Sequence, residues 1–205
     1  ATTWTEQDHW LTESSAVWAE QEATELWGGF VGGFVRDAVV TSRLKKGVHE
    51  SLLSNEPVFA ANLGYATFLW EQFLVEKLAD PAAIKRMFEL MGEGQSALGA
   101  ANDMLEERGE SLEGMFREWT AWNYLVGSRD DGQHYSDGKS VFHGLASSRV
   151  ERTHSTPPST WQTTTTPPAL LATNYLEFDI KKGSSSFSVE VEPGGNQWVG
   201  LTTLG

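Results

Sequence analysis

The sequence predicts an α+β protein: a mostly α-helical part over residues 1–128, a connection over residues 129–168, and an antiparallel, sandwich-like β segment over residues 169–205. Three observations carry this prediction. Apolar residues recur every three to four positions as far as Val126, which is the period of an amphipathic helix. A stretch rich in Thr and Pro follows at residues 153–168 and favours extended backbone. From Ala172 onward apolar and polar residues alternate with a period of two, which is typical of strands.

The first helix is expected within HWLTESSAVWAEQE, residues 9–22. At helical spacing Trp10, Glu13, the pair 16–17 and Glu20 share one face. Four glycines between residues 28 and 33 then interrupt the pattern. The apolar stretch 27–40 is compatible with a close-packed turn or with a strand pair, because glycine permits both.

Four further helices are expected before residue 127. In the first, residues 64–78, the side chains divide into an apolar stripe and a polar face with Glu71 and Glu76. The next begins at Asp80-Pro81, a good start signal, and ends at Gly92. Another covers residues 97–107, and the last opens at Ser111. The expected stripe of the first consists of Phe68, Leu69, Phe73 and Leu74.

The alternating segment is expected to form a meander of strands at about 175–180, 187–192 and 197–201, with a turn at 182–184. Three strands make only a thin sheet. We therefore expect the sheet to continue in another chain or in residues outside this sequence, because an open strand edge is a template for pairing.

Composition excludes several classes of function. The 205 residues carry a formal net charge of −13, which disfavours binding to a phosphate backbone. With no Cys, disulfides, thiolate metal sites and cysteine nucleophiles are excluded. No apolar run approaches the length of about 20 residues that a membrane-spanning helix needs. Because the chain begins at Ala1 rather than Met, we expect it to be processed, truncated or only partly represented.

The segment around Glu13 has the pattern W-x-x-E-x-x-A-x-W-x-E, which resembles the downstream metal-ligand helix of gluzincin-type metallopeptidases, in particular a large group of secreted bacterial and archaeal members. In that family an H-E-x-x-H helix gives two histidine ligands and a general-base glutamate, and a later glutamate completes the zinc site. The resemblance implies that Glu13 is the third zinc ligand and that the protein is extracellular and acts on peptides. Glu20 is a separate candidate for a second-shell position.

Two later blocks extend the resemblance over about residues 8–145. The first is GYATFLWEQFLVEK at residues 64–77, followed by IKRMFE at 84–89. The second is FREWTAWNYLVGSR at residues 116–129, and HYSD at 134–137 fits the family's next loop. The β segment fits the family's β-sandwich appendage more loosely. Order and spacing together carry the resemblance.

The sequence departs from the family in having no H-E-x-x-H. His49-Glu50 starts such a motif, but Leu53 stands at the second histidine position, and the pair follows Glu13 instead of preceding it. Two hypotheses remain open. The chain is a fragment whose histidine helix lies on a preceding segment, or it is a non-catalytic extracellular structural module that assembles through its β edge.

Other candidate sites rest on fewer residues. Asp130, Asp131 and Asp137 are candidate oxygen ligands for calcium, without the spacing of an EF-hand. As candidate catalytic residues we name Tyr65 and His134, which with Tyr135 could stabilise an oxyanion. The sequence contains no P-loop, no G-x-G-x-x-G and no G-x-S-x-G, so nucleotide binding and serine-hydrolase chemistry have no support.

Overall fold

The computed structural model describes residues 8–25, 44, 51–53, 57–58, 61–136, 147–155, 169–180 and 188–190. Its elements, in chain order, are α1 (His9–Glu25), β1 (Pro57–Val58), β2 (Ala61–Asn62), α3 (Leu63–Ala66), α4 (Phe68–Leu78), α5 (Ala82–Gly92), α6 (Ala97–Glu106), α7 (Leu112–Tyr124), the 3-10 turn η2 (Gly127–Arg129), β3 (Val150–His154) and β4 (Tyr175–Phe178). The expected α+β class is confirmed, with helices over most of the described chain.

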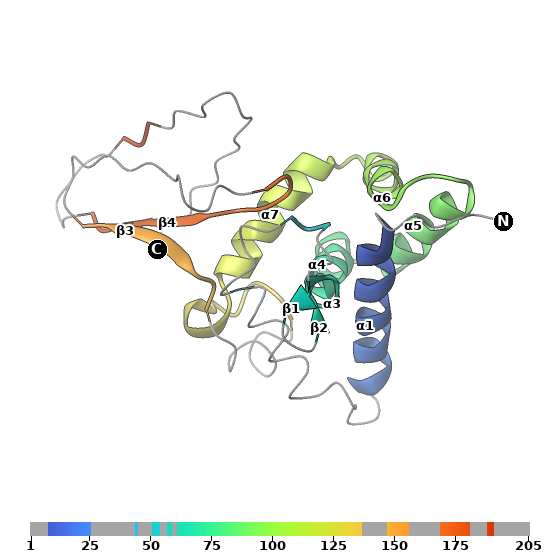
Figure 1. Ribbon diagram of the computed structural model, residues 1–205, viewed down its shortest axis with the longest axis horizontal. Helices are drawn as coiled ribbons and strands as arrows, with labels where there is room; N and C mark the ends of the chain where they lie inside the picture. Colours follow the sequence, from blue (N-terminus) through green and yellow to red (C-terminus); the bar gives the residue numbers. More distant parts are fainter. Residues whose placement is uncertain are drawn as a thin grey trace.

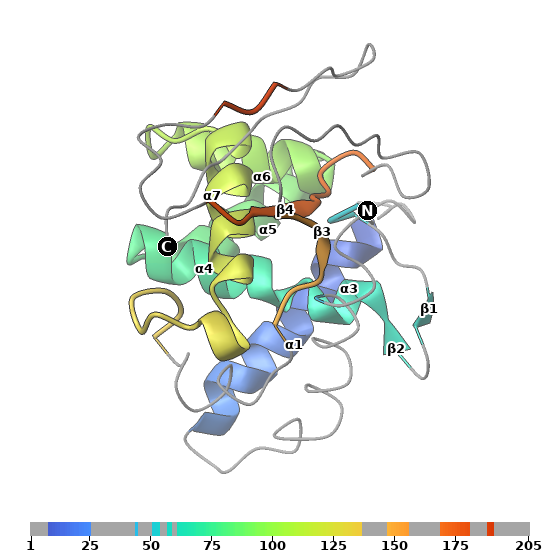
Figure 2. The same cartoon turned by 90° about the vertical axis from the view of Figure 1, so that its left-hand side faces the viewer.

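Helix α4 lies at the centre of the molecule. It packs against α1, α3, α5 and α7, and α5 in turn packs against α6 (Figure 1). Every residue in its first two turns, from Phe68 to Leu74, is buried. In Figure 1, α1 and the β3–β4 pair lie on opposite sides of the molecule, with α4 and α7 between them, and Figure 2 views the molecule from the side of the β3–β4 pair. The core is therefore built around the first two turns of one helix, which are covered on all sides.

Aromatic side chains from two helices form the centre of this core. The indole of Trp70 on α4 meets that of Trp119 on α7 edge to face, with ring centroids 5.7 Å apart. Phe73, one turn further along α4, meets Trp122 in the same way at 5.1 Å. Such edge-to-face pairs add a favourable quadrupole interaction to the burial of apolar area. These contacts fix α7 on α4.

The boundaries of the later helices follow the signals in the sequence. Ser111 caps α7, because its hydroxyl accepts a hydrogen bond from the Gly114 amide at 3.1 Å. At the start of α5 the Asp80 carboxylate accepts one from the Ala82 amide at 2.9 Å. The predicted end of α5 at Gly92 is also confirmed.

One part of the helix prediction was wrong. The stretch 64–78 is not one helix but two, α3 and α4, separated by a turn at Thr67. More importantly, Glu71 does not lie on a polar face, because its side chain is fully buried. An amphipathic reading assumes one solvent-facing side, and the first two turns of α4 have none.

The predicted antiparallel arrangement of the β segment was wrong for the strands that the structure describes. β4 falls within the first predicted strand, but it pairs in parallel with β3, with Val150 opposite Tyr175 and His154 opposite Phe178. All of β3 (Val150–His154) lies within the stretch 129–168 that was expected to be a connection. Residues 188–190 are not in a strand, and the remaining parts of the predicted second and third strands lie outside the described residues.

Within the described residues no helix is both long enough and apolar enough to cross a membrane.

We expect Phe73→Ala to lower the free energy of unfolding by about 3–5 kcal/mol, because it empties a fully buried site against Trp70 and Trp122. Urea unfolding followed by tryptophan fluorescence measures the change. The control is Lys85→Ala on α5, where the side chain is 78% exposed and its surface pairing with Glu89 contributes little to stability. Equal losses in both variants would contradict the central position of α4.

Candidate functional site

Helix α1, which carries the predicted ligand Glu13, is held to the rest of the fold by three polar contacts to three different elements. The first lies at its N-terminal end. The Asp8 carboxylate accepts a hydrogen bond from the Ala97 amide at 2.7 Å and so occupies one of the unpaired amides at the start of α6. Asp8 is itself buried. The contact ties the start of α1 to a helix 89 residues further along the chain.

The second contact is a buried polar cluster between α1 and α4, which we call the Glu71 cluster and which consists of Glu71, Ser14 and Ser15. The Ser14 hydroxyl lies 2.5 Å from Oε1 of Glu71, and the Ser15 hydroxyl donates to the same oxygen at 3.2 Å. Oε2 of Glu71 has no hydrogen-bond partner among the described residues. Sequence reasoning missed this cluster, because serines on α1 and an acid on α4 give no signal that they meet.

The environment of Glu71 favours its neutral form. Complete burial raises the pKa of this carboxyl group to about 8, although the hydrogen bonds from Ser14, from the Glu71 amide and from Ser15 act in the opposite direction. No charged side chain among the described residues contributes to the shift. An isolated buried carboxylate is costly, so such a group retains its proton.

The third contact joins Glu13 to Tyr65 of α3. The Tyr65 hydroxyl lies beside the Glu13 carboxylate, and hydrogen bonding with Glu13, its negative charge and partial burial all raise the pKa of Tyr65. Both side chains are half-buried, at the margin where α1 packs against α3. Glu13 therefore lies beside a hydroxyl donor while remaining partly open to solvent.

Glu13 could supply one ligand of a zinc site, but the described residues do not supply the others. Its carboxylate is a zinc ligand by type, and a tyrosine donor is the kind of partner that orients ligating carboxylates. Within the described residues, however, no three His, Asp or Glu side chains come together as a metal-binding group. His9 is exposed at the start of α1, and Glu20 is half-buried on the same helix. His49 and His143 lie outside the described residues.

The predicted calcium ligands are engaged in the turn that contains them. Asp130 accepts a hydrogen bond from the Gly132 amide at 2.8 Å, and Asp131 accepts one from the Gln133 amide at 2.9 Å. Asp131 also pairs with Nδ1 of His134 at 2.9 Å. Burial acts to raise the pKa of Asp131, but the hydrogen bonds with His134 and Gln133 outweigh it and hold the pKa below its usual range. Asp137 lies outside the described residues.

No contact among the described residues brings the two predicted catalytic residues, Tyr65 and His134, together. Tyr65 bonds to Glu13, whereas the His134 ring packs edge to face on Trp122 at 5.3 Å. Tyr135 is buried, with its hydroxyl 2.8 Å from the side-chain oxygen of Asn123. Burial above all raises the pKa of Tyr135 well above its usual value. His134 and Tyr135 therefore fasten their loop to the core.

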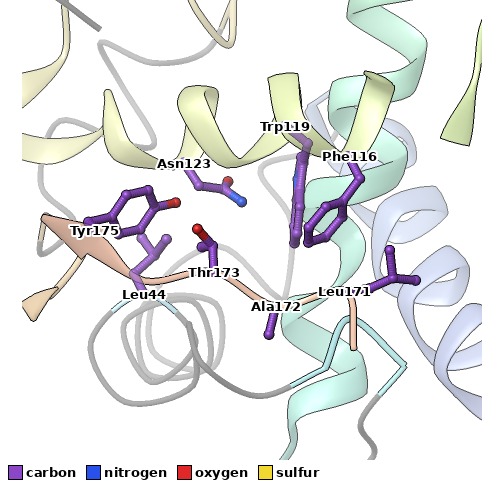
Figure 3. A pocket seen from close by; sticks show the side chains of 8 residues that line it. All are labelled: Leu44, Phe116, Trp119, Asn123, Leu171, Ala172, Thr173 and Tyr175. Atoms are coloured by element: carbon purple, nitrogen blue, oxygen red, sulfur yellow. The ribbon is translucent and has the colours of Figure 1, made fainter. Parts of the chain in front are cut away.

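A shallow hollow lies beside α7, between this helix and the segment before β4 (Figure 3). Phe116 and Trp119 stand next to each other on its α7 side. At the start of β4 the Tyr175 hydroxyl donates to the Thr120 carbonyl at 2.7 Å, which binds the strand to the helix. The hollow is small and none of the residues predicted to carry chemistry lines it. The complete lining is Leu44, Phe116, Trp119, Asn123, Leu171, Ala172, Thr173 and Tyr175.

Comparisons of the chain with models of protein families, with curated proteins and with solved structures gave no significant match. The metallopeptidase resemblance thus rests on the sequence blocks alone.

We expect the Glu71→Gln variant to have a flatter dependence of stability on pH than the native chain. The pKa of Glu71 is about 8 in the folded chain and 4.5 as the reference value. Between these values the folded state keeps a proton that the unfolded chain has released. The unfolding free energy therefore falls by about 1.4 kcal/mol per pH unit across this window and levels off above it. Glutamine does not ionise and lacks this term.

Urea unfolding of both proteins at pH 5.5, 7 and 9 measures the difference. The variant should gain stability relative to the native chain at each step. Titrations of other groups affect both proteins equally, so parallel pH profiles would show that Glu71 is not a buried neutral acid.

Proposed function

We propose that this chain is the downstream part of an extracellular zinc metallopeptidase, in which Glu13 is the third, carboxylate ligand and an H-E-x-x-H helix on a preceding segment supplies the two histidines. The observation that carries the proposal is the placement of Glu13. It lies in the W-x-x-E-x-x-A-x-W-x-E pattern and is half-buried, and its carboxylate interacts with the Tyr65 hydroxyl.

The neighbours of Glu13 support a ligand rather than an ordinary surface glutamate. An exposed glutamate on a helix is normally solvated and has several side-chain conformations. Glu13 instead bonds to Tyr65, which belongs to a different sequence block of the same resemblance. Two blocks that are far apart in the sequence therefore meet at the predicted ligand, as is expected if both serve one site.

In this proposal the chain's own residues bind and orient. When bound, zinc would polarise the scissile carbonyl of a peptide and activate a water molecule. Glu13 would hold the metal through a carboxylate oxygen, and Tyr65 would hold Glu13 by its hydroxyl. The general base would come from the H-E-x-x-H glutamate. Tyr65 and His134 are not assigned to the reacting atoms, and Glu20 remains a second-shell prediction.

The alternative is a non-catalytic extracellular module that assembles through its β edge. One observation favours it: within the described residues β3 pairs with β4 alone, and Leu176 and Ile180 are exposed on and just after β4. Zinc content separates the two functions, because an assembly module has no need of a metal at Glu13.

We expect the full-length polypeptide, with the residues that precede Ala1 in its gene, to bind one zinc ion per chain. Glu13→Gln should weaken zinc binding by at least about 100-fold, since loss of a second-shell partner alone costs 10–100-fold. Competition with a chelator of known zinc affinity measures the change. The matched control is Glu22→Gln, an exposed position on the same helix, which should leave the affinity unchanged.

A full-length polypeptide that contains no H-E-x-x-H and binds no zinc would overturn the proposal. So would a zinc affinity that is the same in the Glu13→Gln and Glu22→Gln variants.

A further inference from the structure

Glu13 and the two serines of the Glu71 cluster are consecutive residues of α1, and their directions are linked. Successive side chains on an α-helix point about 100° apart. Once Ser14 and Ser15 are fixed toward α4, the direction of Glu13 is fixed as well. In the structure Ser14 and Ser15 are buried against Glu71, whereas Glu13 lies half-exposed beside Tyr65.

The Ser14 hydroxyl can form hydrogen bonds with both Glu71 and the Leu11 carbonyl only when Glu71 is a neutral acid. Besides its 2.5 Å contact with Glu71, the Ser14 hydroxyl lies 3.1 Å from the Leu11 carbonyl. A hydroxyl group has a single proton. If Glu71 is protonated at Oε1, the acid donates to Ser14 and Ser14 donates to Leu11. If Glu71 is ionised, Ser14 can donate to only one of these acceptors, and Oε2 is a charged oxygen without a partner in the described part of the chain.

Trp10 and Leu11 of α1 are also buried, and burial of apolar area depends less on direction than a hydrogen bond does. Hydrogen bonds between specific atoms are directional, and buried polar groups are best attested as devices that fix register.

We propose that Glu71, held as a neutral acid between Ser14 and Ser15, is a positioning residue that sets the rotation of α1 and thereby the direction of Glu13. Its importance for a metal rests on the function proposed above. Its effect on Glu13 does not, because the Glu13–Tyr65 hydrogen bond reports that direction without any metal.

Ionisation of Glu71 should disturb its hydrogen bonds with Ser14 and Ser15, so a rise in pH tests the proposal. The other titratable groups around α4 do not interfere with this test. Each helix packed against α4 carries titratable side chains, such as Glu13 on α1, Tyr65 on α3, Arg86 on α5 and Glu118 on α7. All of these are at least partly exposed, and none contributes to the raised pKa of Glu71. Tyr135, which is buried against α4, has a pKa raised well above 10 and so stays neutral at pH 9.

The test follows the Tyr65 ring carbon that bears the hydroxyl, by NMR of tyrosine-labelled chain assigned with Tyr65→Phe. The bonded reference is the native chain at pH 6.5, and the unbonded reference is Glu13→Ala, which removes the acceptor. We expect the double variant Ser14→Ala, Ser15→Ala to move the resonance most of the way to the unbonded reference. Thr12→Ala, which removes a hydroxyl of α1 that donates to the His9 carbonyl, should leave it in place.

If the double variant does not fold, a pH titration decides. The native resonance should move toward the unbonded reference as the pH rises from 7 to 9, and that of Glu71→Gln should not. A folded double variant with a native resonance, or native and Glu71→Gln resonances that stay together up to pH 9, would overturn the inference. Both results are independent of zinc, so they are distinguishable from a failure of the proposed function.

Discussion

Burial of the first two turns of α4 on all sides is the constraint on which the rest of the described structure depends. With no solvent-facing side in its first two turns, every side chain there must find a partner on a neighbouring helix. Trp70 and Phe73 meet the tryptophans of α7, and Glu71 meets the serines of α1. The positions of both flanking helices thus follow from residues of one short segment.

An acid at such a position is less favourable for stability than an apolar residue of similar size. Burial of a carboxyl group without full hydrogen bonding costs free energy, and replacement of buried polar groups by apolar ones is often neutral or stabilising. The acid instead adds hydrogen bonds that depend on the rotation of α1. Leucine at position 71 would bury area against α1 in several rotations, whereas Glu71 bonds Ser14 and Ser15 in one. The cost in stability is consistent with a helix whose orientation matters.

The sequence predicted local structure well and tertiary contacts poorly, for physical reasons. Caps act within one turn, so Ser111 and Asp80 located the starts of α7 and α5. Burial of Glu71 depends on a helix 57 residues away, which no local pattern encodes. The alternation around β4 identified a strand but not its partner, because β3 has little apolar character and its pairing in parallel requires a long connection. Glu13 was predicted to be a zinc ligand by resemblance alone, and its contact with Tyr65 became visible only in the folded structure.

Two glutamates thus lie in opposite surroundings on the two sides of one helix contact. Glu13 lies at the half-exposed margin, where its negative charge is solvated and a tyrosine hydroxyl orients it. Glu71 lies in the interior, where burial keeps it neutral. A carboxylate that is to bind a cation must retain its charge, and a carboxyl group that is to hold a helix in the core must lose it. The adjacent positions of Glu13 and Ser14 couple the two, because α1 cannot turn one toward its partner without turning the other.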